Sequence, residues 1–266
     1  MKVLRQIRNS ISRSGLLGTI GTCARALVFY AKEQTPARRR RRERWMQSEL
    51  EFDRTFGVRT AGTIGLANLA ISSSNRQYAH GYQATSGVVL GEMLSAVPED
   101  LSDFVFIDFG SGLGRALLIA SEYPFRAIRG VEFSPELHKI AVENISSYPS
   151  STQKCRNIES IWQDAAEFMI PDEKAVFYFY NPFLEAVMTR VVQNIEQSLN
   201  QNPRSAYIIY YNPEARSVVD VSAAFRLIGE TATYCVYRSI VGSSRPENPT
   251  QGAPGVSKSN GINVRP

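Results

Sequence analysis

The sequence contains few of the side chains that most often bind metal ions or form disulfides. Its 266 residues include three cysteines, Cys23, Cys155 and Cys235, and two histidines, His80 and His138. The cysteines are far apart and form no C-x-x-C pair, so we expect neither a metal site nor a disulfide framework. Widely spaced cysteines of this kind are typical of reduced thiols, and we expect a cytoplasmic protein.

Long apolar runs are also missing. The most apolar N-terminal stretch, residues 16–30, is interrupted by Arg25. It is shorter than the roughly 20 residues that a bilayer-spanning helix needs. No convincing small-residue cleavage site follows it, so a secretory signal is not expected either.

Positive charge is concentrated at one end of the chain. Residues 1–45 hold twelve Lys or Arg and two Glu, a net charge of +10, whereas the whole chain carries +5. The remainder is therefore mildly acidic and lacks the broad basic face of most nucleic-acid enzymes. Nucleic acid is accordingly not an expected partner of the body.

The basic region has the periodicity of amphipathic helices over residues 2–11 and 17–28, and residues 38–44 are all arginine except Glu43. Three interpretations stay open for residues 1–45: a peripheral membrane contact, a helix packed on the body before a solvated charged linker, and a mitochondrial presequence. We divide the chain into a basic helical extension and linker, a main domain made of a cap and a core, and a disordered tail rich in Gly, Pro and Ser. Their bounds are 1–47, 48–241 (cap 48–98, core 99–241) and 242–266.

Strand and helix patterns alternate through the main domain. Strands are predicted at 104–109, 127–133, 158–163, 175–181, 206–212 and 231–240, and helices at 115–123, from Ser134 onward, at 184–199 and at 214–228. This alternation predicts an α/β fold with a doubly wound, mostly parallel sheet of six or seven strands and helices on both faces. The alternating aromatics of residues 177–180 predict a strand that is buried on both sides.

A glycine-rich turn follows the first strand, in FIDFGSGLGRA over residues 106–116. Ligands of open α/β sheets bind at such strand ends. A P-loop is excluded because no Lys-Ser/Thr pair follows the glycines. The pattern is G-x-G-x-G, and Arg115 stands where a dinucleotide site has its third glycine. Asp108, two residues before Gly110, would repel a diphosphate and favour a cationic group. S-adenosylmethionine (AdoMet) carries such groups, a sulfonium and an α-ammonium.

Acidic residues end the next two strands as well. Glu132 ends the second strand, where a carboxylate accepts hydrogen bonds from ribose hydroxyls, and Phe133 can cover an adenine ring. Asp164 and Ala165 follow the third strand, where a carboxylate can accept from the adenine amino group. Three acids at three successive strand ends are consistent with an adenosine-containing cofactor.

Four segments resemble the ordered motifs of class I AdoMet-dependent methyltransferases: DFGSGLGRA, GVEFSPEL, QDAAEF and FYFYNPF. The likeness covers residues 81–240 and implies a seven-stranded sheet with AdoMet above its first strands. It assigns Glu132 to the ribose, and Phe133, Asp164 and Ala165 to the adenine. The methionine part would be surrounded by Asp108, Gly110, Ser111, Gly112 and Gly114.

Two shorter segments resemble motifs of amine-methylating relatives. Residues 82–85 are similar to the Y-x-P-T segment of bacterial and mitochondrial protein-lysine methyltransferases, in which Tyr and Thr close over AdoMet, and this suggests a bacterial branch of the family. Here Tyr82 and Thr85 are present and Ala84 replaces the proline. Asn181-Pro182-Phe183 resembles a shortened N-P-P-[FY] motif. The resemblance implies that Asn181 accepts from a target nitrogen and that Phe183 contacts the substrate.

We therefore expect methyl transfer to a nucleophile, with an amine nitrogen favoured, on a protein or small molecule. Two other functions stay open: a non-catalytic AdoMet-binding scaffold at a membrane surface, and an RNA methyltransferase whose basic arm contacts the nucleic acid. His80 lies near the predicted lid, residues 82–85. A lone histidine there is expected to be a surface residue whose hydrogen bonds are satisfied. Only one strand is predicted after residue 228, so the seventh strand has no assigned segment.

Overall fold

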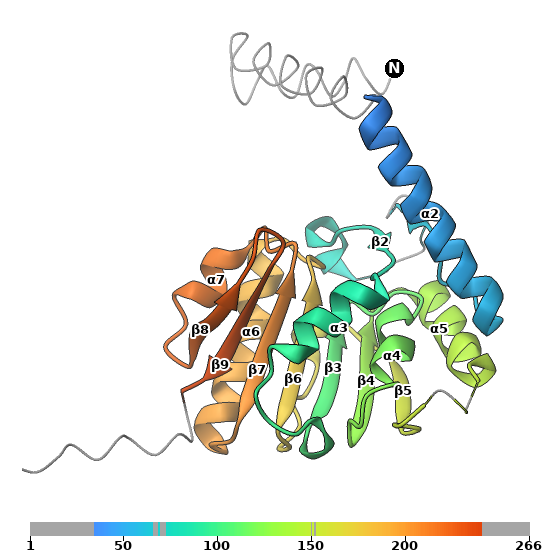
Figure 1. The fold of residues 1–266 in the computed structure, drawn as a ribbon. Helices are drawn as coiled ribbons and strands as arrows, with labels where there is room; N and C mark the ends of the chain where they lie inside the picture. Colours follow the sequence, from blue (N-terminus) through green and yellow to red (C-terminus); the bar gives the residue numbers. More distant parts are fainter. Residues whose placement is uncertain (1–34, 66–68, 70–72, 150, 152, 241–266) are drawn as a thin grey trace, which may run out of the picture.

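The computed structural model describes residues 35–65, 69, 73–149, 151 and 153–240 (Figure 1). The amphipathic segments expected at 2–11 and 17–28, and the tail expected over 242–266, lie outside these residues. Within the described ranges, no helix combines the length and the apolar character that crossing a membrane requires.

A seven-stranded sheet forms the centre of the molecule, in the order β5-β4-β3-β6-β7-β9-β8. The first five strands in this order are parallel, while β9 runs antiparallel to both β7 and β8. The strands are β3 (Val105–Phe109), β4 (Ala127–Glu132), β5 (Ile158–Trp162), β6 (Ala175–Tyr180), β7 (Ala206–Tyr211), β8 (Phe225–Glu230) and β9 (Tyr234–Ser239). The predicted α/β fold with a mostly parallel sheet is confirmed.

Helices cover both faces of this sheet (Figure 1). One face carries α3 (Gly87–Ser95), α4 (Arg115–Ala120) and α5 (Pro135–Ser147), and the other carries α6 (Glu185–Gln201) and α7 (Arg216–Asp220). Because side chains alternate along a strand, Phe106 faces α3 and α4 whereas Ile107 faces α6. Such burial on both faces explains the continuous apolar runs of these strands.

The strand order reverses between β3 and β6. From β3 the chain adds β4 and β5 on one side, and it then returns to place β6 and β7 on the other. The loops that leave β3 and β6 therefore diverge and open a crevice at the carboxyl ends of the strands. This is the place at which the sequence predicts a ligand.

A small cap lies at this edge. It contains β1 (Thr63–Ile64), the 3-10 helix η2 (Ser74–Tyr78) and β2 (Tyr82–Gln83), with β1 and β2 paired antiparallel. An isolated bridge joins Ala79 to Phe183 in the loop after β6. Two more short 3-10 helices, η3 (Leu101–Asp103) and η4 (Ala165–Glu167), precede β3 and follow β5.

The structure corrects the predicted C-terminal half of the core. The helix predicted over 214–228 is wrong, because α7 ends at Asp220 and the missing seventh strand, β8, occupies Phe225–Glu230. In β8 only Phe225 is buried, and the register shifts between Leu227 and Gly229. An edge strand with one buried residue and a bulge lacks the alternation by which strands are recognised.

The structure also corrects the expected charged linker. Residues 36–56 form one helix, α2 (Pro36–Phe56), so the predicted boundary at 47/48 falls inside a continuous element. Pro36 occupies the first turn of this helix, where its missing N–H costs nothing. Arginine and glutamate are good helix formers, and Arg39 pairs with Glu43 one turn later. The helix ends at Gly57, whose φ is +65°.

Candidate active site

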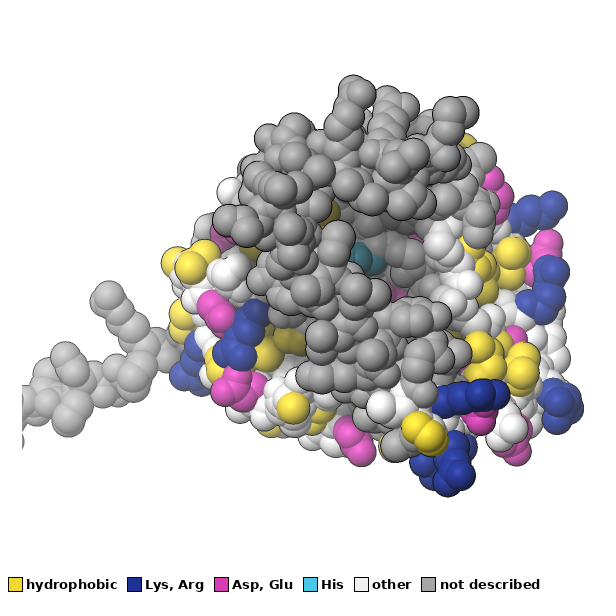
Figure 2. Space-filling view, turned by 90° about the horizontal axis from the view of Figure 1, so that it is seen from above, with side chains coloured by type: hydrophobic (Ala, Val, Ile, Leu, Met, Phe, Trp, Pro, Cys, Tyr) yellow, Lys and Arg dark blue, Asp and Glu magenta, His cyan; other side chains and the backbone are white. Residues whose placement is uncertain are grey.

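A concave site lies at the carboxyl ends of β3, β4 and β6. It encloses about 610 Å³, including space open to solvent. Its walls come from the glycine turn, the ends of the three strands and the cap. Figure 2 shows the molecule from above, the side on which the cap lies in Figure 1. A smaller pocket of about 280 Å³ adjoins the concave site and shares Ala79, Gly110, Phe133 and Phe183.

The glycine turn has a backbone that only glycine adopts without strain. Gly110, Gly112 and Gly114 all have positive φ, at +82°, +55° and +82°. A Cβ on Gly112 would lie 2.1 Å from Cδ2 of Tyr82, so the tyrosine ring rests directly on the turn. The turn is tied to β4, because the backbone N–H groups of Gly110 and Ser111 donate to the Val131 carbonyl.

Asp108 lies beneath this turn and is 3 % exposed. Within the described part of the chain we find no hydrogen-bond donor to its carboxylate. Burial, and secondly the neighbouring Glu132 carboxylate, raise the pKa of Asp108 well above its usual value. A buried carboxyl group without a partner matches a ligand that brings a cation.

Glu132 is equally buried, but its carboxylate is held. One oxygen accepts from the Gly112 N–H and the other from the Ser134 N–H, both at 2.8 Å. Burial raises the pKa of Glu132 to about 7, against the opposing effect of these hydrogen bonds. The glutamate thereby fixes the glycine turn and faces the cleft, where each oxygen keeps a lone pair for a ribose hydroxyl.

Ser111 supplies a second unpartnered group. Its hydroxyl oxygen is buried and has no hydrogen-bond partner among the described residues, yet the residue lines the cleft. Buried hydroxyls in proteins are normally hydrogen-bonded, so an orphan in a cleft wall is consistent with a polar ligand atom nearby. Together with Asp108, this hydroxyl fits the amino-acid end of AdoMet.

Asp164 and Phe133 lie around the smaller pocket. Phe133 lines both pockets and Ala165 lines the smaller one, and the contact of each with an adenine stays a prediction. One oxygen of Asp164 accepts from the Ser73 hydroxyl at 2.5 Å and from the Asn75 amide at 2.9 Å, and the other accepts from the Ala166 N–H. Asp164 thus fastens the segment around η2 to the sheet edge, and its adenine contact stays a prediction.

The two predicted lid residues are both anchored by hydroxyl groups. The Tyr82 hydroxyl donates to the Thr60 carbonyl at 2.6 Å. Thr85 is buried, and its hydroxyl lies 3.2 Å from that of Tyr178. Thr85 therefore contacts the residue that pairs with Asp108 in the register of β3 and β6. Both residues line the cleft, and their contact with a cofactor stays a prediction.

Asn181 lies in a strained corner after β6. It is buried, its φ is +39°, and Pro182 follows, although a residue before proline prefers an extended backbone. Its side-chain oxygen lies 3.5 Å from the Tyr210 hydroxyl. Among the described residues that line the cleft are Pro182 and Phe183 but not Asn181. The structure therefore brings Phe183 to the site, while the catalytic role of Asn181 stays a prediction.

Several wall residues were not found from the sequence. His80 lines the cleft, its Nε2 is buried without a hydrogen-bond partner, and the carboxylate of Glu214 lies 3.9 Å away. The bridge between Ala79 and Phe183 brings His80 there, and the sequence gives no sign of this pairing. Tyr178 and Tyr180 also line the cleft at the end of a strand that we predicted to be fully buried. Among the described residues, no cluster of His, Cys, Asp or Glu has the arrangement of a metal site.

No family model matches the sequence, and a search of curated proteins finds no similar one. Solved structures do match. One is an RNA methyltransferase from Salinibacter ruber in complex with S-adenosyl-L-homocysteine, with 23% identity, 62% of this chain and 98% of that chain covered, and a TM-score of 0.44. Another is the magnesium protoporphyrin IX methyltransferase of Synechocystis PCC 6803 with bound SAM, with 9% identity, 57% and 76% covered, and a TM-score of 0.41.

The strand order of this chain is the decisive observation. Five parallel strands are followed by β9, which inserts antiparallel between β7 and β8, and this is the seven-stranded sheet that the motif resemblance implies. The fold is that of class I methyltransferases. The two similar structures act on different acceptors by their descriptions, and the assignment of the fold rests on the strand order and not on them.

Proposed function

We propose that this chain is an AdoMet-dependent methyltransferase that transfers a methyl group to a nitrogen nucleophile of a protein or small molecule. The observation that supports this most strongly is the buried, unpartnered Asp108 beneath the glycine turn. A carboxylate there disfavours a diphosphate and favours the α-ammonium or sulfonium of AdoMet. The orphan hydroxyl of Ser111 beside it supports the same ligand.

Each wall residue then has a binding role. Asp108 would hold the cationic end, Glu132 the ribose hydroxyls, and Phe133 with Asp164 the adenine. Tyr82 and Thr85 would cover the ligand from the cap. When bound, AdoMet supplies a methyl group already activated by its sulfonium. The protein therefore mainly has to align the nucleophile and exclude water, and a strong catalytic base is not required.

The acceptor would approach from the side of the cleft formed by the loop after β6. Tyr180, Pro182 and Phe183 give this side an apolar and aromatic wall. An amine must lose its proton before it can attack, and the buried Nε2 of His80 is an available acceptor for that proton. Asn181 remains the candidate for binding the amine, a role for which its amide has to turn from Tyr210 toward the cleft.

Calorimetry of the full chain with S-adenosylhomocysteine and with NAD tests the cofactor. We expect saturable binding of S-adenosylhomocysteine and no heat of binding with NAD, because a diphosphate would meet the Asp108 carboxylate. Binding of NAD in preference to the adenosyl ligand would refute the proposal.

The acceptor can be identified by incubating the protein with methyl-labelled AdoMet and cell extract. We expect label that protease or small-molecule extraction removes and that ribonuclease leaves in place. The His80→Gln variant should label less than wild type, while His138→Gln, whose imidazole contacts Ser160 away from the cleft, should label normally. Ribonuclease-sensitive label would show that RNA is the acceptor, and no transfer in any extract would favour the non-catalytic scaffold.

RNA is kept as a second candidate because of one structural observation. Helix α2 presents Arg39, Arg40 and Arg44 as exposed side chains, so an anionic partner can reach them. The same arginines also fit the surface of an anionic membrane. Sedimentation of the full chain with vesicles of anionic lipid, and separately gel shift with a cellular RNA fraction, distinguishes the two partners. A charge reversal of Arg40 and Arg44 should weaken whichever binding is real.

A further inference from the structure

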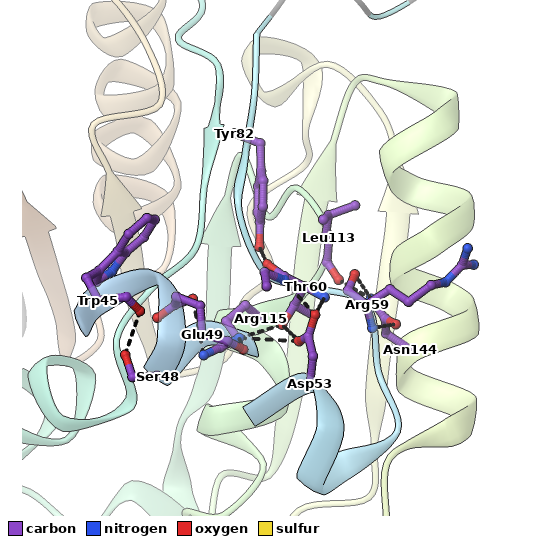
Figure 3. Close-up of polar contacts among 11 residues, drawn as sticks. Trp45, Ser48, Glu49, Asp53, Arg59, Thr60, Tyr82, Leu113, Arg115 and Asn144 are labelled. Atoms are coloured by element: carbon purple, nitrogen blue, oxygen red, sulfur yellow. Dashed lines mark hydrogen bonds and ion pairs between the residues drawn. The ribbon is translucent and has the colours of Figure 1, made fainter. Parts of the chain in front are cut away.

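A buried arginine joins the glycine turn to helix α2 (Figure 3). Arg115, the residue directly after Gly114, is 3 % exposed at the start of α4. Its guanidinium lies 3.2 Å from the Glu49 carboxylate and 3.4 Å from that of Asp53, both on α2. The Phe52 ring of the same helix lies 3.8 Å from its central carbon. The Arg115 side chain, which follows the glycine turn, is thus enclosed by helix α2, and this helix ends before the cap begins.

The contacts continue from Arg115 to the lid through one residue. Arg115 donates to the Thr60 hydroxyl at 2.7 Å, and the Thr60 carbonyl accepts from the Tyr82 hydroxyl at 2.6 Å. Asp53 holds Thr60 in place, since its two oxygens accept from the backbone N–H and the hydroxyl of that threonine. Figure 3 shows this line of contacts from Tyr82 through Thr60 to Arg115.

A second clamp fixes the same segment from the other side. The Asn144 side chain on α5 accepts from the Arg59 N–H and donates to the Arg59 carbonyl and to the Leu113 carbonyl of the glycine turn. Residues 59–60 are therefore tied both to the turn and to α4. The position of the Tyr82 hydroxyl is set by this short segment.

The charges argue against a purely stabilising role for the cluster. Removing Arg115, Glu49 and Asp53 from water is costly, and burial raises the pKa of Glu49 and lowers that of Arg115. Replacing such buried ion clusters with apolar side chains is often neutral or stabilising, so stability alone is a weak reason for them. A planar guanidinium that contacts two carboxylates and a hydroxyl does, however, fix geometry well.

We propose that Arg115 is a positioning residue that seats the Tyr82 ring on Gly112 and thereby closes the cleft over the methionine part of AdoMet. Arg115 also lines the cleft, and in this proposal it acts on the lid through Thr60. This inference rests on the proposed function, because the closure matters only if an adenosyl amino acid binds there. It adds α2 and Thr60 to the groups that hold the cofactor, whereas Arg59 takes part only through its backbone.

Calorimetry with two probes tests the inference in the full chain. The probes are S-adenosylhomocysteine and 5′-methylthioadenosine, which lacks the amino-acid part. We expect Arg115→Lys, which keeps the charge but loses the planar fork, to bind S-adenosylhomocysteine about tenfold more weakly and 5′-methylthioadenosine within about twofold of wild type. The matched control is Arg59→Lys, because the Arg59 side chain is exposed and pairs only with Glu143 among the described residues.

Tyr82→Phe tests whether the two residues act as one unit. This variant removes only the hydroxyl, so it should reproduce the loss for S-adenosylhomocysteine. The double variant with Arg115→Lys should lose little more than either single variant, because both changes break the same line of contacts. Fully additive losses, or equal losses for both probes, would mean that Arg115 only stabilises the fold.

Hydrogen exchange gives a readout that does not depend on the cofactor. If wild type bound no S-adenosylhomocysteine, the proposed function would fail, but the seating of Tyr82 could still be measured. Arg115→Lys should then speed exchange of the amides in β1 and β2, relative to wild type and Arg59→Lys. Unchanged exchange there would overturn the positioning role, whatever the cofactor.

Discussion

Asp108→Asn is expected to weaken binding of S-adenosylhomocysteine about 100-fold or more, the loss typical of breaking a buried charge pair. The substitution keeps the shape of the side chain and removes only its charge. The α-ammonium of the ligand would then enter a buried site without a counter-charge. Calorimetry measures the dissociation constant. The control is Asp103→Asn, since Asp103 precedes the same strand but is exposed and paired with Lys174.

The same titrations should depend on pH. In the empty cleft, burial and the neighbouring Glu132 hold the pKa of Asp108 well above its usual value, and burial raises the pKa of Glu132 to about 7. A bound cation favours the charged carboxylates and lowers both pKa values. Binding therefore releases protons, and affinity should rise as pH increases through about 7. Titrations in buffers of different ionisation enthalpy would count these protons. Tight binding by Asp108→Asn, with unchanged proton release, would contradict the role of Asp108.

Gly112→Ala is expected to destabilise the fold and to open the lid. Its Cβ would lie 2.1 Å from the Tyr82 ring, and the φ of +55° is strained for alanine. The left-handed backbone costs about 1–2 kcal/mol, and displacing a packed ring costs about 1–3 kcal/mol more. Urea unfolding should show a loss of about 2–5 kcal/mol on these grounds. Affinity for S-adenosylhomocysteine should fall with it, because Tyr82 can no longer lie on the turn.

Gly229→Ala is the matched control for this change. Gly229 lies in the edge strand β8, where an added Cβ would meet nothing within 4 Å. Its stability should change little, and its ligand affinity not at all. If Gly112→Ala behaved like this control, the tyrosine would not rest on the turn in solution.

The part of the site that lies on the sheet could be predicted from sequence. Asp108 and Glu132 lie at the carboxyl ends of buried strands that are recognisable by their continuous apolar character, and parallel strands end at the same edge. The positions of these acids therefore follow from the strand assignment alone. Two elements with weak sequence patterns were not predicted. Strand β8 has only one buried residue, and the exposed half of α2 is helical without an apolar stripe.

The part of the site that lies in the cap could not be predicted. His80 reaches the cleft through a bridge to Phe183, and Arg115 meets α2 across more than fifty residues of sequence. Contacts of this range leave no local periodicity. Arg115 stood out only as the residue that replaces a dinucleotide glycine, and this substitution gives no indication of its partners.

Helix α2 has a consequence for exchange of the cofactor. The helix is continuous from the exposed Arg39 to the buried Glu49, a span of ten residues or about 15 Å. A macromolecule that binds these arginines and shifts the axis of α2 would also displace the lid. By reciprocity, a protein loaded with cofactor would then hold that macromolecule with a different strength from an empty one. Affinity for the cofactor and occupancy of the arginines would in that case be two measurements of one equilibrium.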